Sequence, residues 1–255
     1  MSFICILLEP ALWYTLIGAA VGAIVSFIFM RIYEHHKDKQ RVELYTSDIR
    51  LLTEQSIQYL KLCIGGMQEY VNRIRANAYA PQPLQEGTLE PIKRIQRLNT
   101  TMVYEAFKEQ EKGDKYIPFL QYIDQIYMIL DGVYTDYRER NKSIVMFINE
   151  FQDLVAKSID LCQQGKNTPA KDVLAEYETY RIGKEQVDIS AVYQHLVQPL
   201  LQCLTTADME LYAKLDRADY LYKSICAHQN SFADNVLQVQ KDIETSMAEL
   251  KRMQL

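Results

Sequence analysis

The most constraining feature of the chain is an uncharged apolar segment, Ala11 to Met30, which contains no proline. A helix of about 20 residues crosses the roughly 30 Å hydrocarbon core of a bilayer. Nine residues of the segment are Leu, Ile, Val or Phe. At about −0.3 to −0.6 kcal/mol each, these side chains favour insertion by about 3–5 kcal/mol. No second stretch of this kind follows, so the sequence predicts one transmembrane helix at residues 11–30.

Two other interpretations of this segment are less consistent with the residues around it. A cleaved signal peptide begins with a basic region and ends at a small-residue cleavage site. The residues before Ala11 include no Lys or Arg, and the apolar segment ends in Phe27-Ile28-Phe29-Met30. A core helix of a soluble protein keeps a polar stripe, which this segment lacks. The pattern therefore favours a signal-anchor that is retained.

The flanks of the segment predict its orientation. Glu9 is the one charged residue before it, whereas Arg31, Lys37, Lys39 and Arg41 follow within eleven residues. Because Lys and Arg accumulate on the cytoplasmic side, residues 1–10 are predicted to be extracytoplasmic and residues 31–255 cytoplasmic. Aromatic and basic side chains favour the two interfaces, so the expected membrane-interface anchors are Trp13, Tyr14, Arg31 and Tyr33.

Three small residues recur every four positions inside the apolar segment: Gly18, Gly22 and Ser26. Small residues at this spacing let two helix backbones approach closely in lipid. The ridge predicts association between the transmembrane helices of two copies. Gly is also frequent in membrane helices that do not associate, and that alternative stays open.

The cysteines agree with a cytoplasmic bundle. There are five, Cys5, Cys63, Cys162, Cys203 and Cys226, with long spacings and no C-x-x-C pair. An odd number at such spacings is typical of reduced thiols rather than of a disulfide framework.

The remainder of the chain is predicted to be an all-α, elongated antiparallel helical bundle with long coiled-coil-like helices. Gly and Pro are sparse, and apolar residues recur at steps of three and four. We expect helices at about 31–79, 88–112, 116–164, 168–182, 188–199 and 208–253, with a clear break at 80–87 and a kink or break at Pro199. A subdivision into residues 31–165 and 168–255 is possible.

The two longest predicted helices carry apolar seams with a heptad rhythm. One runs from Tyr116 to Cys162 and the other from Leu211 to Met253. Such seams must be covered, either by one another within the chain or by another chain, and periodicity does not distinguish these cases. Several of the 18 tyrosines lie on the seams. Each buried tyrosine needs a partner for its hydroxyl group, so the core is predicted to be partly polar.

One basic cluster flanks the proline-rich break. If the helices on either side formed a hairpin, five side chains would gather at its tip as a possible partner-binding site: Arg73, Arg75, Lys93, Arg94 and Arg97. A solvated tip is the simpler interpretation, and an acidic partner the more specific one.

The sequence contains few patterns that are typical of a catalytic or metal site. Arg31 and His36 stand at the R-x4-H spacing of ribonucleases of the higher-eukaryote-and-prokaryote nucleotide-binding class, so the chain is similar to them in two residues. The same spacing arises when Arg31 reaches lipid head groups and His36 faces water. His35 and His36 have no acidic or thiol residue at a convincing metal-ligand spacing. We expect no catalytic residues, no metal and no cofactor.

These features predict a single-pass membrane-anchored scaffold or sensor subunit that acts through protein–protein interaction and is not an enzyme. Its expected partners are the bilayer, a second copy and an unidentified protein. Nucleic acid is not expected, because the net charge is −5. One alternative is a membrane effector whose transmembrane helix oligomerises and perturbs the bilayer. A helical ribonuclease is a distant alternative.

Overall fold

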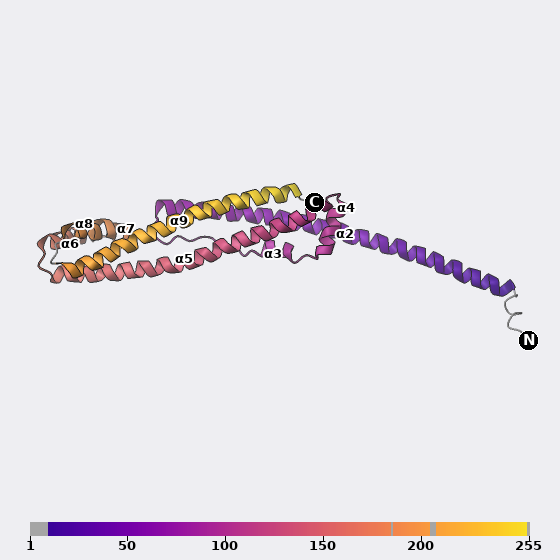
Figure 1. Cartoon of the computed structure of the whole chain (residues 1–255), viewed down its shortest axis with the longest axis horizontal. Helices are drawn as coiled ribbons and strands as arrows, with labels where there is room; N and C mark the ends of the chain where they lie inside the picture. The colour runs from indigo at the N-terminus through magenta and orange to yellow at the C-terminus, as the bar shows by residue number, and fades with distance from the viewer. Residues whose placement is uncertain (1–9, 185, 205–207, 254–255) are drawn as a thin grey trace, which may run out of the picture.

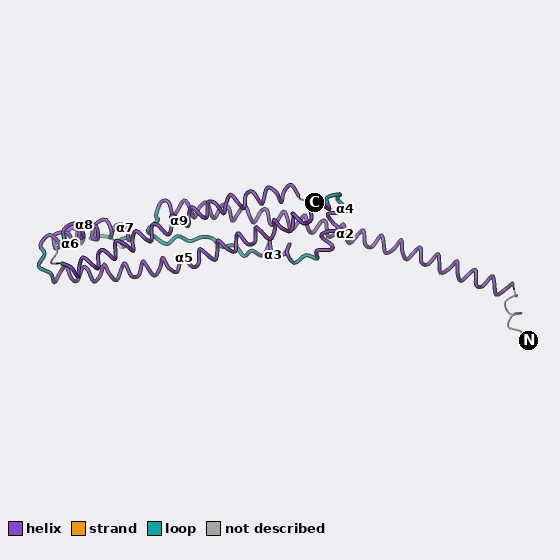
Figure 2. The backbone as a smooth tube through the Cα atoms, viewed as in Figure 1, coloured by secondary structure: helices purple, strands orange, loops and turns teal. Residues whose placement is uncertain are grey.

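The computed structural model describes residues 10–184, 186–204 and 208–253, and every regular element in that part of the chain is helical (Figure 2). The expectation of an all-α, elongated antiparallel bundle is confirmed. The predicted extracytoplasmic residues 1–9, with Cys5 and Glu9, lie outside the described residues. So does the side chain of Trp13.

The chain begins with one very long helix, α2 (Pro10–Ala76), which is 67 residues long. At 1.5 Å per residue it is about 100 Å long. The predicted apolar segment and the predicted helix after it are therefore one continuous element, which ends three residues before the expected position. Gly65 and Gly66 do not interrupt it, and Gly66 lies against the side chain of Gln85.

The segment after α2 departs from the sequence expectation. One helix at 88–112 was predicted, but the structure has two, α3 (Glu90–Gln96) and α4 (Thr100–Glu109). The Asn99 side chain accepts a hydrogen bond from the Met102 amide at 3.2 Å and so caps a new helix start. The N-cap of α3 is Leu89, which has a left-handed conformation with φ of 54°.

The next helix agrees closely with its prediction. A short 3₁₀ turn, η1 (Gly113–Lys115), leads into α5 (Tyr116–Gln164), 49 residues long. The predicted seam residues face inward along it, and α5 continues without a break past Asn141.

Four short elements follow α5: α6 (Thr168–Arg181), α7 (Ile189–Val192), the π-helical turn η2 (Tyr193–Val197) and α8 (Gln198–Cys203). The predicted kink or break at Pro199 is replaced by this π turn, in which the Gln198 amide donates to the Tyr193 carbonyl. A proline ring crowds the carbonyl four residues earlier, and a wider turn gives it room. The helix therefore continues through Pro199.

The last helix, α9 (Met209–Met253), returns along α5 for most of its length and also packs against α2 (Figure 1). α2 and α5 run in one direction and α9 in the other, while α6, α7 and α8 cover the end far from the N-terminus (Figure 1). The first half of α2 projects from the opposite end of the bundle (Figure 1).

The core is divided along the length of the molecule. One cluster joins α2, the 77–89 segment, α3, α4 and parts of α5 and α9, and includes Phe107, Phe119 and Phe232. A second joins α6, η2 and α8 to the distal parts of α5 and α9, and includes Phe151 and Leu200. A small third cluster of Ile144, Ile148 and Ile225 lies on α5 and α9. A subdivision between residues 165 and 168 would separate α5 from α6, which share the second cluster.

Candidate functional site

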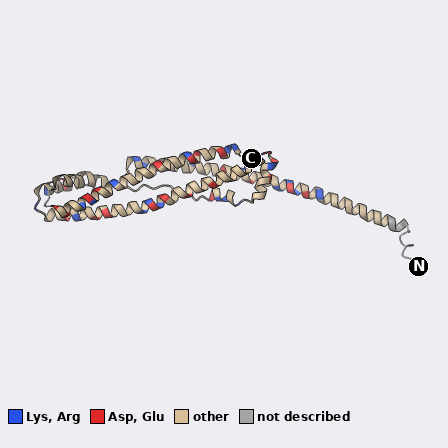
Figure 3. Cartoon of the chain, in the orientation of Figure 1, with Lys and Arg blue, Asp and Glu red and all other residues tan. Residues whose placement is uncertain are grey.

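The most unusual surface of the molecule is the first half of α2. Every described side chain from residue 14 to residue 41 is exposed. This part of α2 includes an apolar window with a mean hydropathy of 2.0, none of which is buried by the rest of the structure. Figure 3 shows the contrast, since the outer part of α2 lacks the charged residues that cover the bundle. By length and composition, α2 is therefore long enough and apolar enough to span a membrane.

The cost of leaving this surface in water is large. Phe27, Phe29 and Ile24 are 63%, 68% and 59% exposed. Burying one such side chain is worth roughly 1.5–3 kcal/mol. Contiguous apolar surface of this extent marks a contact with lipid or with protein.

The predicted small ridge lies within this uncovered part. An added Cβ at Gly18 or Gly22 would have no described atom within 4 Å beyond the local helix backbone. Ser26 is also exposed. The ridge is therefore accessible from outside and takes no part in the packing of the bundle.

The described interface residues also lie on the bare helix. Tyr14 and Tyr33 are exposed, and the Arg31 guanidinium carbon lies 5.9 Å from the centre of the Phe27 ring. Arg31 is thus the first basic side chain after the apolar segment and leans back toward it. Their placement at a lipid interface remains a prediction.

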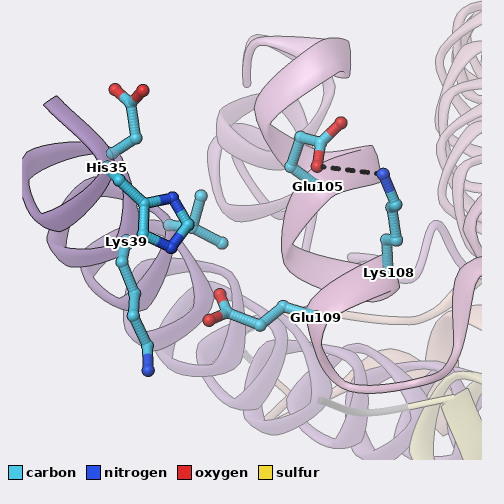
Figure 4. A pocket seen from close by; sticks show the side chains of 7 residues that line it. His35, Lys39, Glu105, Lys108 and Glu109 are labelled. Atoms are coloured by element: carbon cyan, nitrogen blue, oxygen red, sulfur yellow. Dashed lines mark ion pairs between the residues drawn. The ribbon is translucent and has the colours of Figure 1, made fainter. Parts of the chain in front are cut away.

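A pocket of about 440 Å³ lies where α2 enters the bundle (Figure 4). His35, Asp38, Lys39 and Val42 line it from α2, and Glu105, Lys108 and Glu109 line it from α4. In Figure 4 the Glu109 side chain extends toward α2, and Lys108 pairs with Glu105 at 3.8 Å. Charges of both signs meet here, so the pocket has no strong preference for an ionic ligand. Among the described residues no group of three or more His, Cys, Asp or Glu is placed to hold a metal ion.

Arg31 and His36 are on the exposed part of α2. A shallow pocket beside them is lined by residues 31–38 of that same helix, and within the described residues no second element contributes to it. A composite nuclease site would need groups from other elements around the substrate. The geometry at Arg31 and His36 gives no support to a ribonuclease.

The predicted basic tip is not assembled. Arg73 and Arg75 lie at the end of α2, whereas Lys93, Arg94 and Arg97 belong to α3 or its C-terminal end. The 77–89 segment runs back beside α2, and the Ser56 hydroxyl donates to the Pro91 carbonyl at 3.2 Å. Ser56 and Arg73 are separated by about 25 Å along the helix. The two halves of the cluster therefore lie apart.

The acidic neighbours of these basic residues explain why neither half is strongly positive. Arg73 pairs with Glu69 on α2. Arg97 pairs with Glu90 at 3.0 Å, and Arg94 is 4.0 Å from the same carboxylate. Exposed pairs of this kind contribute little stability, but they reduce the local positive potential.

A buried polar cluster that sequence reasoning missed holds the 77–89 segment against the bundle. The Tyr134 hydroxyl donates to the Cys63 sulfur at 3.5 Å, and the Tyr59 hydroxyl accepts from the Leu89 amide at 3.4 Å. Burial raises the pKa of Tyr59 and Tyr134, so both stay neutral at physiological pH. A Cβ at Gly87 would overlap the Tyr59 ring and hydroxyl. Only the sharp return of the chain brings these residues together.

Some tyrosines on the seams, and Tyr193 in η2, have hydrogen-bond partners for their hydroxyl groups. Tyr137 donates to the Gln82 carbonyl at 3.3 Å, and Tyr222 donates to the Ser190 hydroxyl at 3.2 Å. The Tyr193 hydroxyl donates to Asp219 at 2.7 Å. Burial, with the Asp219 carboxylate, raises the pKa of Tyr193 to about 12. These contacts are structural, since each joins two packed segments of the bundle.

Comparison with protein-family models, with curated proteins and with solved structures finds no match to the chain. The function must therefore be inferred from the uncovered helix and from the bundle that it joins.

Proposed function

We propose that the protein is a single-pass membrane-anchored scaffold or sensor subunit that acts through protein–protein interaction. Residues 11–30 cross the bilayer, the N-terminus is outside, and the bundle is cytoplasmic. The observation that supports this most directly is that the bundle buries none of the apolar window of α2. A core helix of a soluble protein would be covered by its own fold, whereas a bilayer supplies the cover that this helix lacks.

The continuity of α2 supports a role in which membrane and bundle act as one body. The helix that carries residues 11–30 also supplies Ile49, Leu60 and Met67 to the core. A rotation or tilt of the membrane segment is therefore transmitted to the bundle without a flexible linker. Such coupling is what a sensor requires, and it also fixes the direction in which a scaffold projects.

The length of the bundle is consistent with the binding of a partner far from the membrane. α5 is 49 residues long, or about 74 Å. Since α2 enters the bundle near α4, the α6–α8 end lies far from the membrane (Figure 1). A protein partner could bind there at a distance from lipid head groups.

Membrane extraction with a charge-insertion variant tests the anchor. The double variant Val21→Arg and Ile24→Arg, near the middle of residues 11–30, adds about 5–7 kcal/mol to the insertion free energy, more than the apolar side chains supply. We expect the natural chain in the carbonate-resistant membrane pellet and this variant in the supernatant. The matched control is Met128→Arg with Met146→Arg, at two exposed positions of α5, which should stay in the pellet.

Protease protection tests the orientation. A C-terminal tag should be protected in intact cells and cleaved after the membrane is opened. Cleavage of the tag on intact cells would contradict the proposed orientation, and a natural chain in the carbonate supernatant would contradict the anchor.

The membrane effector remains a second candidate, because the same bare helix carries the accessible ridge of Gly18 and Gly22. Dye release from vesicles that contain the protein would favour the effector. Capture of one defined protein partner without dye release would favour the scaffold.

A further inference from the structure

The cytoplasmic part of α2 carries an outward stripe that the bundle leaves uncovered. We call it the outer stripe, and it consists of Leu44, Ser47, Leu51, Gln55, Gln58 and Leu62. All six side chains are exposed, with Leu44, Leu51 and Leu62 at 67%, 53% and 75%. None of the six is charged, although 24% of the chain is charged. An exposed face of this length without charge is typical of a surface that contacts another helix.

The bundle packs on the opposite side of α2. Ile49, Leu60 and Met67 are buried, and on an ideal helix they lie about half a turn around from Leu51 and Leu62. A partner that docks on the outer stripe would therefore meet α2 without displacing α3, α4 or α9.

The outer stripe lies on the same face of α2 as the small ridge of the apolar segment, and Tyr33, Lys37 and Gln40 occupy that face between them. Each residue of the ridge has a counterpart in the stripe 29 residues later: Ser47 follows Gly18, Leu51 follows Gly22, and Gln55 follows Ser26. Because 29 residues make about eight full turns, each pair points in nearly the same direction. α2 has no interruption between them. The ridge in the apolar segment and the stripe in the cytoplasmic segment therefore share one face of one helix.

We propose that this shared face pairs with the same face of a second copy, so that two α2 helices form a parallel dimer from the membrane into the cytoplasm. The inference rests on the proposed anchor. Copies inserted with the same orientation present their α2 helices in parallel, with small ridges and outer stripes at equal heights. The two bundles then lie on opposite sides of the helix pair.

The spacing of the outer stripe is consistent with this pairing. Leu44 and Gln55, Ser47 and Gln58, and Leu51 and Leu62 are each eleven residues apart. An 11-residue repeat gives a slightly right-handed supercoil. Paired small residues four apart in lipid also favour a right-handed crossing. Both parts of the face therefore favour a right-handed crossing of the two helices.

The contact area requires both parts of the face. Two helices in contact along residues 18–62 share a band about 67 Å long and roughly 10 Å wide. Counted over both copies, about 1,350 Å² is buried, within the usual range of 1,200–2,000 Å² for a specific dimer. The outer stripe alone would bury about 570 Å², which is below that range. The cytoplasmic contact is therefore an extension of the membrane contact.

Cysteine crosslinking of the full chain in membranes tests the proposal. In a Cys5→Ser background, Leu44→Cys and Leu62→Cys place thiols on the proposed seam. Glu43→Cys and Lys61→Cys place them at the same heights, turned by about 100° around the helix. Because a disulfide needs Cα atoms within about 7 Å, we expect at least about five-fold more crosslinked dimer at the two seam positions.

A charge variant checks that the crosslinks report a stable seam rather than collisions. Leu51→Glu places two carboxylates opposite each other and should lower the Leu44→Cys and Leu62→Cys yields about five-fold. Met128→Glu, an exposed apolar position on α5, should leave them unchanged. Circular dichroism on each variant confirms that the helices remain folded.

Carbonate extraction of the same samples distinguishes failure of the proposed dimer from failure of the proposed membrane anchor. Protein in the pellet with equal yields at all four positions, or with no dimer, overturns the seam and leaves the anchor intact. Protein in the supernatant overturns both. Protein in the pellet with the seam pattern and the Leu51→Glu loss supports the dimer.

Discussion

At the residue scale, the 77–89 segment depends on a glycine whose importance the sequence does not reveal. Gly87 lies against the Tyr59 hydroxyl, which accepts a hydrogen bond from the Leu89 amide. Leu89 itself has φ of 54°, a strained value for a branched side chain. The polar contact and the glycine together hold the chain in the sharp return that places α3 on α2.

The variant Gly87→Ala tests this contact. The added Cβ would displace the Tyr59 ring and break its hydrogen bond, so we expect a loss of about 1–3 kcal/mol in the free energy of unfolding. Urea unfolding followed by circular dichroism measures it. Gly132→Ala is the matched control, because a Cβ there meets open space on α5 and should stabilise the helix by about 0.5–1 kcal/mol. Equal effects of the two variants would contradict the role given to Gly87.

At the element scale, α2 is one continuous helix with two different kinds of surface. Its first half is apolar and bare, and its second half is amphipathic and packed. Because α2 has no break, the direction in which the small ridge of the apolar segment points is fixed relative to the side of α2 that packs in the bundle. For this reason a substitution in the apolar segment should change the pairing of two copies at the outer stripe.

The variant Gly22→Ile tests that connection. A branched side chain on the ridge keeps two backbones apart, so crosslinking through Leu44→Cys should fall several-fold even though residue 44 is about 33 Å away along the helix. Ala23→Ile adds the same side chain about 100° around the helix and should have little effect. Unchanged crosslinking with Gly22→Ile would remove the ridge from the interface.

At the scale of the whole molecule, α5 and α9 join the two large core clusters into one body. Both helices contribute buried side chains to both clusters, and α9 packs along α5. Without α5 and α9, the buried side chains of each cluster would be partly exposed to solvent. The bundle should therefore unfold in one transition, although it is long and its clusters are far apart.

Cavity-forming substitutions in each cluster test this cooperativity. Phe107→Ala removes a fully buried ring from the first cluster, and Leu200→Ala removes a fully buried side chain from the second. Each should cost about 2–5 kcal/mol and shift the same urea transition to lower denaturant. Val145→Ala, at an exposed position on α5, is the control and should shift it little. Two separate transitions in either cavity variant would contradict a single cooperative unit.

The sequence by itself determined the helical class, the long helices and the position of the apolar segment. Apolar residues at steps of three and four give the ranges of α5 and α9 almost to the residue, because amphipathic periodicity is a local property of the chain. The apolar segment is equally local, since 20 uncharged residues are visible without any knowledge of their neighbours.

Only the tertiary structure decided which surfaces meet. The sequence placed five basic residues at one tip, but the return of the 77–89 segment separates Arg73 from Lys93. It also predicted one helix where the Asn99 cap creates two, and a kink or break at Pro199, where a π turn continues the helix. The azimuth of the outer stripe likewise emerged only once the buried side of α2 was known. The separation of the basic residues and the azimuth of the outer stripe depend on contacts between residues distant in the chain, which no local periodicity encodes.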